Sequence, residues 1–460
     1  MYPITPRAGS LLSAPRNAVI ALLVAGLVLW VINLVHARPL FLDEANVVRN
    51  LFDRGYAGLF VPLDHEQYAP PLYLALTKLL GELLGYREVV LRLPAFAGGL
   101  LAVYALYRAG NYLRLGYWTL LPLALCFTNA TVLRYVGEVK PYGLDLGLAA
   151  LVLALHLRPA ARPNRWAWTG LGMLLPWFSL PSVFVLGGVG LVKLLRDVRW
   201  LAPIAGWLAS FAVLYLTVLR QSVGTDYLDS FHAAYFVRIP ASVADWRALG
   251  HLGWSVLRLV YGHTAVSLLW GGVVVTYGLV HVRLRHLVLI LPLLLAAAAS
   301  GLHFYSLIDR LLLFALPGVW LATALAARRL YASLRPPLRI VFLVVTLFAL
   351  TSTGAWRGYY RPVTYSDGRA LAALAVRHPY TYDSLAEPVL DYYLRIHPDH
   401  GKVHPPAGAD AKAYFRLYDV TTAPSVRAML SADSTRLLRA GCRVSKTELY
   451  RAAALRVDCP

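Results

Sequence analysis

Two adjacent carboxylates, Asp43 and Glu44, begin seven residues after an apolar segment that runs from Asn17 to His36. A carboxylate held at a membrane surface can act as a general base, because partial desolvation raises its pKa toward the working pH. Consecutive residues of a helix point about 100° apart, so only one of the two can face a substrate directly. We expect Asp43 to be the base and Glu44 to support it. The alternative is that both simply begin a helix, where acidic side chains interact favourably with the helix dipole.

A second polar stretch runs from Arg134 to Tyr142 and joins two apolar segments. Lys140 is suited to pair with a phosphate, and Glu138 to orient it. Tyrosine and lysine also favour the membrane interface, so simple anchoring is the alternative. Against anchoring, an acid this near the apolar boundary is costly without a partner. We therefore predict that Arg134, Lys140 and Tyr142 bind a phosphate, with Glu138 lining the pocket.

The third stretch runs from His303 to Arg310. Arginine presents a planar fork of donors that matches phosphate, so Arg310 is a candidate head-group clamp. The alternatives are an ion pair with Asp309 or a snorkelling side chain. The remaining candidate pocket residues share a polar or aromatic side chain near one of these stretches: His65, Glu66, Tyr68, His303 and Tyr305.

Composition identifies a membrane protein with many spans. Of 460 residues, 58% are hydrophobic and only 15% are charged, and the mean hydropathy is +0.56. A soluble chain of this length could not cover itself with so little polar surface. The net charge of +20 raises nucleic acid as a partner. However, most basic residues form short clusters between apolar segments, as cytoplasmic loops would place them, so we predict no nucleic-acid binding.

Eleven apolar segments are predicted to span the membrane, and the first reads as a retained signal-anchor. They are residues 18–36, 89–108, 117–133, 141–157, 166–180, 181–195, 200–219, 263–282, 286–304, 307–327 and 338–355. With a cytoplasmic N-terminus, the basic clusters then fall at every second loop. A single tilted helix over 166–195 would reverse that order downstream.

Two long segments are expected on the outer side. Residues 37–88 form the first; its apolar part, Pro71 to Gly85, is short for a span and is predicted to be interfacial or re-entrant. If it did span, the charge pattern would invert downstream. Residues 220–263 form a second polar and aromatic outer loop, which we expect to cap a cavity.

Beyond the transmembrane domain, residues 1–355, the tail from 356 to 460 is polar enough to be a small soluble α/β domain on the outer side. Its Cys442 and Cys459 could form a disulfide there, or remain free. Cys126 lies in an apolar helix and is predicted to be a core residue. No His or Cys cluster has metal-ligand spacing, so no metal and no other cofactor is indicated, although a divalent ion stays possible. The sequence contains no internal repeat, P-loop or GxGxxG motif.

The order of these motifs resembles bacterial members of glycosyltransferase family 39, relatives of protein O-mannosyltransferases and the lipid A aminoarabinose transferase in the GT-C superfamily. The resemblance covers roughly residues 17–330 and lies in the following stretches: Asp43-Glu44, Tyr68-Ala69-Pro70-Pro71-Leu72-Tyr73, Gly85-Tyr86-Arg87-Glu88-Val89-Val90-Leu91-Arg92-Leu93-Pro94 and Glu138-Val139-Lys140-Pro141-Tyr142. Lys140 stands where the family signature has arginine, which keeps the charge but loses the bidentate fork. Leu311 follows Arg310 where an aromatic residue is usual.

The resemblance implies an all-α polytopic GT-C enzyme that inverts configuration as it moves a sugar from a polyprenyl-phosphate donor. The acceptor would be a lipid, glycan or protein on the outer face of the bacterial cytoplasmic membrane. In the family pattern Asp43 matches the catalytic base, and Lys140 and Arg310 match positions near the donor phosphate. A site of this kind should open to membrane lipids.

Two other functions stay open. A transporter or flippase would place ionisable residues near the bilayer midplane, as Asp145 inside a predicted span allows. A polysaccharide polymerase or ligase would use the same donors and would also need a large outer loop.

Overall fold

A computed structural model of the chain describes residues 16–36, 38–159, 164–220, 232–281, 284–352, 365–398 and 411–460. Their contacts divide the chain into two units. The first, here called the helical unit, comprises Met1–Val35, Ala69–Leu76 and Arg92–Arg361. The second, here called the loop-sheet unit, comprises His36–Tyr68, Thr77–Leu91 and Pro362–Pro460. The first predicted outer loop therefore groups largely with the C-terminal residues.

Apolar helices make up the helical unit. Its α-helices are α1 (Arg16–Val35), α4 (Glu88–Tyr112), α5 (Leu120–Thr128), α6 (Ala130–Tyr135), α7 (Tyr142–Leu157), α8 (Arg165–Phe178), α9 (Ser182–Leu194), α10 (Leu201–Leu214), α13 (Val243–Tyr261), α14 (Ala265–Val280), α15 (Leu291–Gly301), α16 (Leu316–Ser333) and α17 (Pro336–Thr351). Short 3-10 or π turns are η2 (Gly116–Thr119), η3 (Val198–Trp200), η4 (Tyr215–Leu219), η5 (Ala233–Tyr235), η6 (Leu284–Leu289) and η7 (Asp309–Ala315). The first residues of α4 and the last of α3 belong to the loop-sheet unit.

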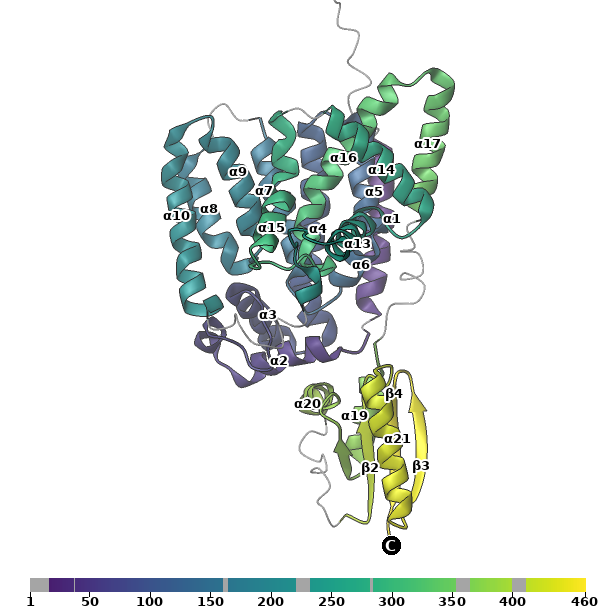
Figure 1. Ribbon diagram of the computed structural model, residues 1–460. Helices are drawn as coiled ribbons and strands as arrows, with labels where there is room; N and C mark the ends of the chain where they lie inside the picture. Colours follow the sequence, from purple (N-terminus) through teal and green to yellow (C-terminus); the bar gives the residue numbers. More distant parts are fainter. Residues whose placement is uncertain are drawn as a thin grey trace, which may run out of the picture. The chain divides into compact units, whose positions relative to one another are not determined.

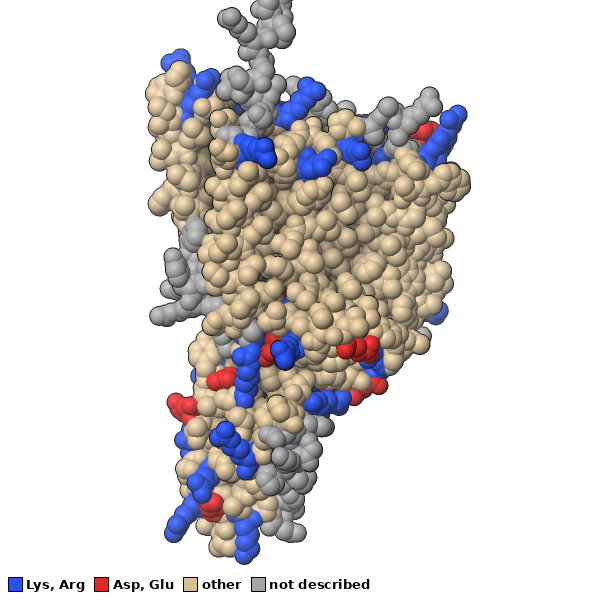
Figure 2. All heavy atoms as spheres, turned by 180° about the vertical axis from the view of Figure 1, so that it is seen from behind, with Lys and Arg blue, Asp and Glu red and all other residues tan. Residues whose placement is uncertain are grey.

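Each of the eleven predicted spans contains at least one described helix. Four helical segments are both long and apolar enough to cross a bilayer: Arg16–Val35, Glu88–Tyr112, Val198–Leu219 and Asp309–Ser333. Others, such as α7 and α9, are apolar but shorter. Figure 2 shows the surface that results on one face of this unit, an apolar band with Lys and Arg gathered along one edge. The predicted polytopic, mostly helical membrane fold is thus confirmed.

The structure resolves one point that the sequence leaves open. The segment 166–195 forms two helices, α8 and α9, which are separated at Ser179 to Pro181. Ser179 is extended, and Pro181 lacks the backbone donor that a continuous helix would need. Trp207 of α10 fixes α8 by donating a hydrogen bond to the Trp168 carbonyl at 2.9 Å.

Two predicted segments differ in secondary structure from what the sequence suggests. The predicted span 117–133 breaks at Asn129, whose side chain accepts a hydrogen bond from the Val132 amide at 2.9 Å and so caps α6. The described part of the second outer loop is largely helical, because Ser242 and Asp245 form a capping box for α13. The α13 helix is bent by 100° from α14, so Figure 1 shows it along its axis while its neighbours run side by side. Residues 221–231 of that loop lie outside the described residues.

The loop-sheet unit combines short helices with one four-stranded sheet. Its elements are α2 (Leu42–Asp53), η1 (Tyr56–Phe60), the second half of α3 (Pro71–Leu84), α19 (Gly368–Arg377), β1 (Tyr380–Tyr382), α20 (Glu387–Ile396), β2 (Ala413–Tyr418), α21 (Pro424–Arg439), β3 (Arg443–Leu449) and β4 (Ala452–Asp458). The strand order is β1-β2-β4-β3, with β1 and β2 parallel and the other pairs antiparallel. The predicted small C-terminal α/β sheet is thus confirmed.

Helices cover both faces of this sheet. Successive residues of a strand point to opposite faces, so Tyr418 and Leu455 face one side, where they form a core with Val426 and Leu437 of α21. Leu417 pairs with Ala454 and faces the other side. β4 lies between β2 and β3 and is buried along most of its length.

Cys442 and Cys459 are joined by a disulfide. The two cysteines are 17 positions apart, one just before β3 and the other just after β4. Cys126 is buried in α5 as a free thiol. Oxidising conditions permit such a bridge, and the outer location of this unit stays a prediction.

Candidate functional site

An ion pair links the end of α6 to a buried carboxylate in the turn before α7. Glu138 is only 5% exposed, and its carboxylate accepts a hydrogen bond from Arg134 Nε at 2.9 Å. The Arg134 guanidinium also stacks over the Tyr135 ring, 4.8 Å from its centroid. A buried carboxylate is costly unless it is paired, and Arg134 supplies that pairing. This arrangement favours a structured polar site over simple anchoring.

Arg310 joins this turn from a distant part of the sequence. It lies in the first turn of η7, which packs against both α6 and α7. The Arg310 side chain hydrogen-bonds to Tyr135, which also feels the charges of Arg134 and Glu138. The Tyr135 ring meets the Tyr142 ring edge-on, with centroids 5.0 Å apart. Two of the three predicted motifs therefore meet at Tyr135.

Tyr135 is the residue that sequence reasoning missed. Its position beside Arg134 places it in the predicted stretch, but nothing in the local pattern separates it from an interfacial anchor. Lys140 lies in the same turn and is buried at 7% exposure. We refer to Arg134, Glu138, Tyr142 and Arg310, which surround Tyr135, together with Lys140 of the same turn, as the Tyr135 cluster.

Close packing of α4 and α7 holds the start of α7 in place. A Cβ atom at Gly98 would lie 2.4 Å from the Gly143 carbonyl oxygen, and one at Gly147 would lie 2.2 Å from the Gly98 oxygen. Only glycine lets two helices approach this closely, as in the small-residue interfaces of membrane helices. Tyr142, next to Gly143, is thereby fixed relative to α4.

Asp309 has a role of its own in the helical unit. Its carboxylate accepts a hydrogen bond from the Ser255 hydroxyl of α13 at 2.9 Å. Nearby, Arg258 Nε donates to His263 Nδ1 at 2.8 Å, and the charge of Asp309 also acts on His263. Asp309 therefore ties the first turn of η7 to α13.

His303 and Tyr305 make mainly packing contacts. The Tyr305 hydroxyl donates to the Leu311 carbonyl at 2.7 Å, and its ring lies edge-on to Phe184 of α9, with centroids 4.8 Å apart. His303 is exposed, has a φ of 61°, and lies edge-on to Phe236 at 5.0 Å. Tyr305 thus braces η7 against α9, and a direct substrate contact stays a prediction for both residues.

The predicted acid pair begins α2 in the loop-sheet unit. Glu44 is 1% exposed, and its carboxylate accepts a hydrogen bond from the Phe41 amide at 3.2 Å. Glu44 therefore caps its own helix, which is the structural alternative to a role in catalysis. Asp43 is half-buried in the same turn. The pair thus divides into a capping residue and a residue that remains the candidate base.

Contacts from Asn50 and Arg54 to Asp64 hold the turn that contains His65 and Glu66. Asn50 accepts a hydrogen bond from the Asp64 amide at 2.9 Å, and Arg54 pairs with the Asp64 carboxylate at 2.8 Å. His65 and Glu66 follow with φ values of 61° and 55°, a left-handed conformation that is uncommon outside glycine. Both side chains are exposed, and Tyr68 is half-buried. The strained turn is typical of functional loops.

Helix α20 anchors α2 within the loop-sheet unit. Arg49 of α2 pairs with Glu387 at 2.8 Å and with Asp391 at 3.1 Å. The Tyr393 hydroxyl accepts a hydrogen bond from the Leu40 amide at 3.0 Å and donates one to Glu88 Oε1 at 2.9 Å.

Arg369 pairs with the same Glu88 oxygen at 2.7 Å. Burial, with the Glu88 carboxylate beside it, raises the pKa of Tyr393, which keeps the hydroxyl protonated as a donor. Helix α20 thus holds the segment that leads into Asp43, while Arg369 of α19 pairs with Glu88 at the start of α4.

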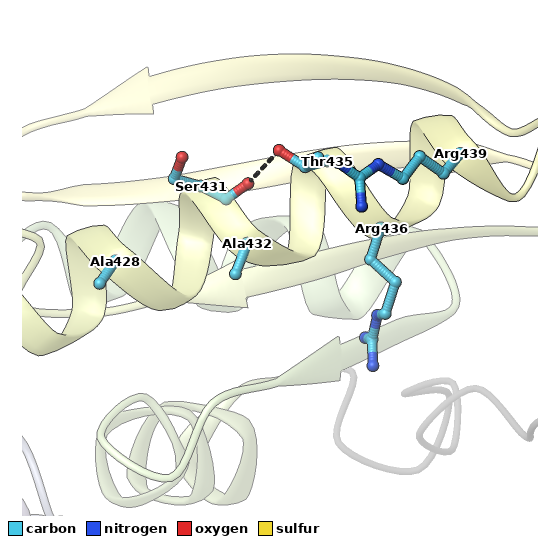
Figure 3. A pocket seen from close by; sticks show the side chains of 6 residues that line it. All are labelled: Ala428, Ser431, Ala432, Thr435, Arg436 and Arg439. Carbon is cyan, nitrogen blue, oxygen red and sulfur yellow. Dashed lines mark hydrogen bonds between the residues drawn. The ribbon is translucent and has the colours of Figure 1, made fainter.

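Two cavities lie away from these residues. One is a groove along α21, and Figure 3 shows that Ala428, Ser431, Ala432, Thr435, Arg436 and Arg439 line it from that single helix. It has no opposing wall among the described residues that line it. The other lies at the ends of α7, α8 and α9. Among the described residues, no group of three or more His, Cys, Asp or Glu side chains is arranged to hold a metal ion.

Comparison with known proteins adds a fold relationship. No protein-family model and no curated protein matches the sequence. The structure resembles ArnT from Cupriavidus metallidurans in the apo state, with a TM-score of 0.55 and 15% identity over 96% of this chain and 98% of that chain. It equally resembles ArnT from the same organism bound to undecaprenyl phosphate, with a TM-score of 0.55, 13% identity and the same coverage. The chain is therefore an integral-membrane helical protein with an ArnT-like fold.

Proposed function

We propose that the chain is a glycosyltransferase of the GT-C type that moves a sugar from a polyprenyl-phosphate donor, with inversion, to an acceptor outside the cytoplasmic membrane. The acceptor would be a lipid, a glycan or a protein. The fold likeness to ArnT over nearly the whole of both chains supports this class. The proposal also draws on the ArnT structure with undecaprenyl phosphate, a lipid of the predicted donor type.

The observation that carries the proposal is the Tyr135 cluster. Arg134 and Arg310 both act on Tyr135 in the helical unit, with Glu138 as the acid paired to Arg134, and Lys140 is buried in the turn that follows α6. Cations beside a leaving phosphate act where negative charge develops in the transition state, the kind of stabilisation that is usually largest in enzymes. Tyr142 would add a hydroxyl to the phosphate oxygens.

In the proposed reaction, an acceptor O–H or N–H attacks the anomeric carbon as the bond from that carbon to the phosphate oxygen breaks. Asp43 takes the acceptor proton, and polyprenyl phosphate leaves with the bonding electron pair. Glu44 supports Asp43 by capping α2. His65, Glu66, Tyr68, His303 and Tyr305 are proposed to line the pocket for the sugar or the acceptor.

The test starts with the donor. Mass spectrometry of lipids that co-purify with the protein should identify a polyprenyl-linked sugar, which then serves as substrate in a reconstituted transfer assay. Asp43→Asn should abolish transfer while the protein stays folded in detergent, because the amide cannot accept the proton. Glu44→Gln should retain most activity, since its amide oxygen can still cap α2. Normal transfer by Asp43→Asn would refute the base assignment.

A labelling experiment tests the side of the membrane. Cys126 is buried and the other two cysteines are bridged, so a new exposed cysteine gives a clean signal. Leu84 is 57% exposed, and Leu84→Cys should react with a membrane-impermeant thiol reagent from outside intact cells. Labelling only after permeabilisation would place the first loop in the cytoplasm and contradict the proposed orientation.

A further inference from the structure

A cavity of about 750 Å³ lies in the helical unit at the far end of α7 from the Tyr135 cluster. The ends of α7 and α9, the start of α8 and the η3 turn all contribute side chains to it. Helix α7 has 16 residues, which corresponds to a length of about 24 Å at 1.5 Å per residue. The cavity is therefore separate from the candidate donor site.

Three cations converge on this cavity. Lys193 Nζ lies 4.5 Å from the centroid of the Trp168 ring and 4.1 Å from that of Trp200. Arg196 follows one helical turn later, and Arg158 enters from the end of α7. Either helix C-terminus alone would attract one basic residue through its dipole. The dipole does not account for three cations lining one hollow.

Acidic groups do little to neutralise this charge. Asp197 is the one acid among the described lining residues, and its carboxylate accepts a hydrogen bond from the Arg199 amide at 3.0 Å. That contact commits Asp197 to capping η3. The described lining therefore carries three cations against one anion, a net excess of positive charge suited to an anionic ligand.

The other walls of the cavity are apolar. Trp168 and Trp200 are almost fully buried, at 8% and 4% exposure. The rest of the apolar lining is Leu155, Pro159, Ala167 and Leu171. A free inorganic ion would gain nothing from these side chains. An amphiphile would gain from both parts, because its charged head meets the cations while its apolar portion meets the leucine and tryptophan surfaces.

We propose that this cavity binds the phosphate head group of an anionic membrane lipid. In the predicted orientation the cavity opens at the cytoplasmic leaflet, where anionic lipids create a negative surface potential. Basic pockets between transmembrane helices on this side are a known mode of head-group recognition. The inference does not depend on the proposed transferase activity.

Native mass spectrometry of the purified, delipidated full-length protein tests the proposal. Titration with phosphatidylglycerol should give a bound lipid with at least tenfold higher affinity than phosphatidylcholine. The double variant Lys193→Gln/Arg196→Gln should lose that preference. Lys193→Arg should keep it, because a cation remains over the tryptophan rings. The matched control Arg199→Gln, which removes a charge three residues from Arg196 but outside the cavity, should bind as the wild type does.

Several results would overturn the proposal. One is equal binding of the two lipids by the wild type, and another is unchanged binding by the double variant. Inorganic phosphate that displaces phosphatidylglycerol at similar concentrations would assign the cavity to a free anion instead. If the double variant does not fold, the single variants Arg158→Gln and Arg196→Gln, which alter exposed side chains, replace it. An Arg196→Cys variant that labels from outside intact cells would contradict the cytoplasmic location.

Discussion

The hydroxyl of Tyr393 accepts a hydrogen bond from the backbone amide of Leu40 at 3.0 Å. Leu40 lies three residues before Asp43, so a helix from the C-terminal part of the chain holds the entry to the proposed catalytic helix. The same hydroxyl donates to Glu88, which Arg369 also contacts. Residues of α19 and α20 therefore hold the segment before Asp43 and the start of α4 in place.

Tyr393→Phe should lower the transfer rate without a comparable change in donor KM. The change leaves the buried Leu40 amide without its acceptor, a loss of about 1–3 kcal/mol. If about half of that is lost from the transition state, kcat falls roughly two- to tenfold. The matched control is Tyr392→Phe, which removes a hydrogen bond to the Tyr86 carbonyl at 2.8 Å. Equal effects on kcat from the two variants would contradict a positioning role for Tyr393.

Arg310→Ala should weaken binding of undecaprenyl phosphate to the purified protein. A charge-assisted hydrogen bond contributes about 1.5–3 kcal/mol, so the Kd should rise at least tenfold. The measurement is equilibrium binding of undecaprenyl phosphate itself, which needs no knowledge of the sugar. Arg247→Ala, on the exposed surface of α13, serves as control. An unchanged Kd for Arg310→Ala would remove Arg310 from the phosphate role.

Gly147→Ala should destabilise the helical unit. The new methyl group would meet the Gly98 carbonyl oxygen at 2.2 Å, and overpacking of this kind costs about 1–3 kcal/mol. A Cβ atom at Gly170 of α8 would meet no heavy atom within 4 Å, so Gly170→Ala should keep or slightly raise the thermal midpoint. Thermal unfolding in detergent distinguishes the two. A midpoint for Gly147→Ala at the wild-type value would show that α4 and α7 can separate.

Asp419→Asn should stabilise the loop-sheet unit at neutral pH. Burial raises the pKa of Asp419 from its ordinary value of 3.8 to about 6, and the neighbouring Asp383 and Asp367 add to the effect. A folded-state pKa above the unfolded value means that stability falls as the pH rises from about 4 to about 6, and then stays lower. The full difference corresponds to roughly 3 kcal/mol.

The variant should therefore match the wild type near pH 4 and exceed it above pH 6. Unfolding of the full chain, followed at several pH values, measures the effect. Asp458→Asn, which changes a partly exposed acid in the same unit, should retain the wild-type pH profile. A wild-type profile for Asp419→Asn as well would show that burial does not raise the pKa of this carboxyl.

Much of the fold follows from local sequence. Apolar segments long enough to cross a bilayer predict the helices, and each predicted span contains one. The polar tail, predicted to be a small α/β domain, contains the four strands and the helices α19, α20 and α21. Breaks within the predicted spans are harder to predict. In the span 117–133 the break depends on one side chain, Asn129, which caps the start of α6 inside an otherwise apolar segment.

The sequence by itself determined the membrane class, the helical segments and three candidate polar stretches, since hydropathy and spacing are local properties. Only the tertiary structure decided that Arg310 meets the stretch around Glu138 at Tyr135, that Glu44 caps its helix, and that Cys442 bonds to Cys459. The physical reason is that contacts between residues far apart depend on how helices pack. Gly98, Gly143 and Gly147 allow α4 and α7 to pack closely because they have no side chains. The sequence shows these glycines but not which helix each one faces.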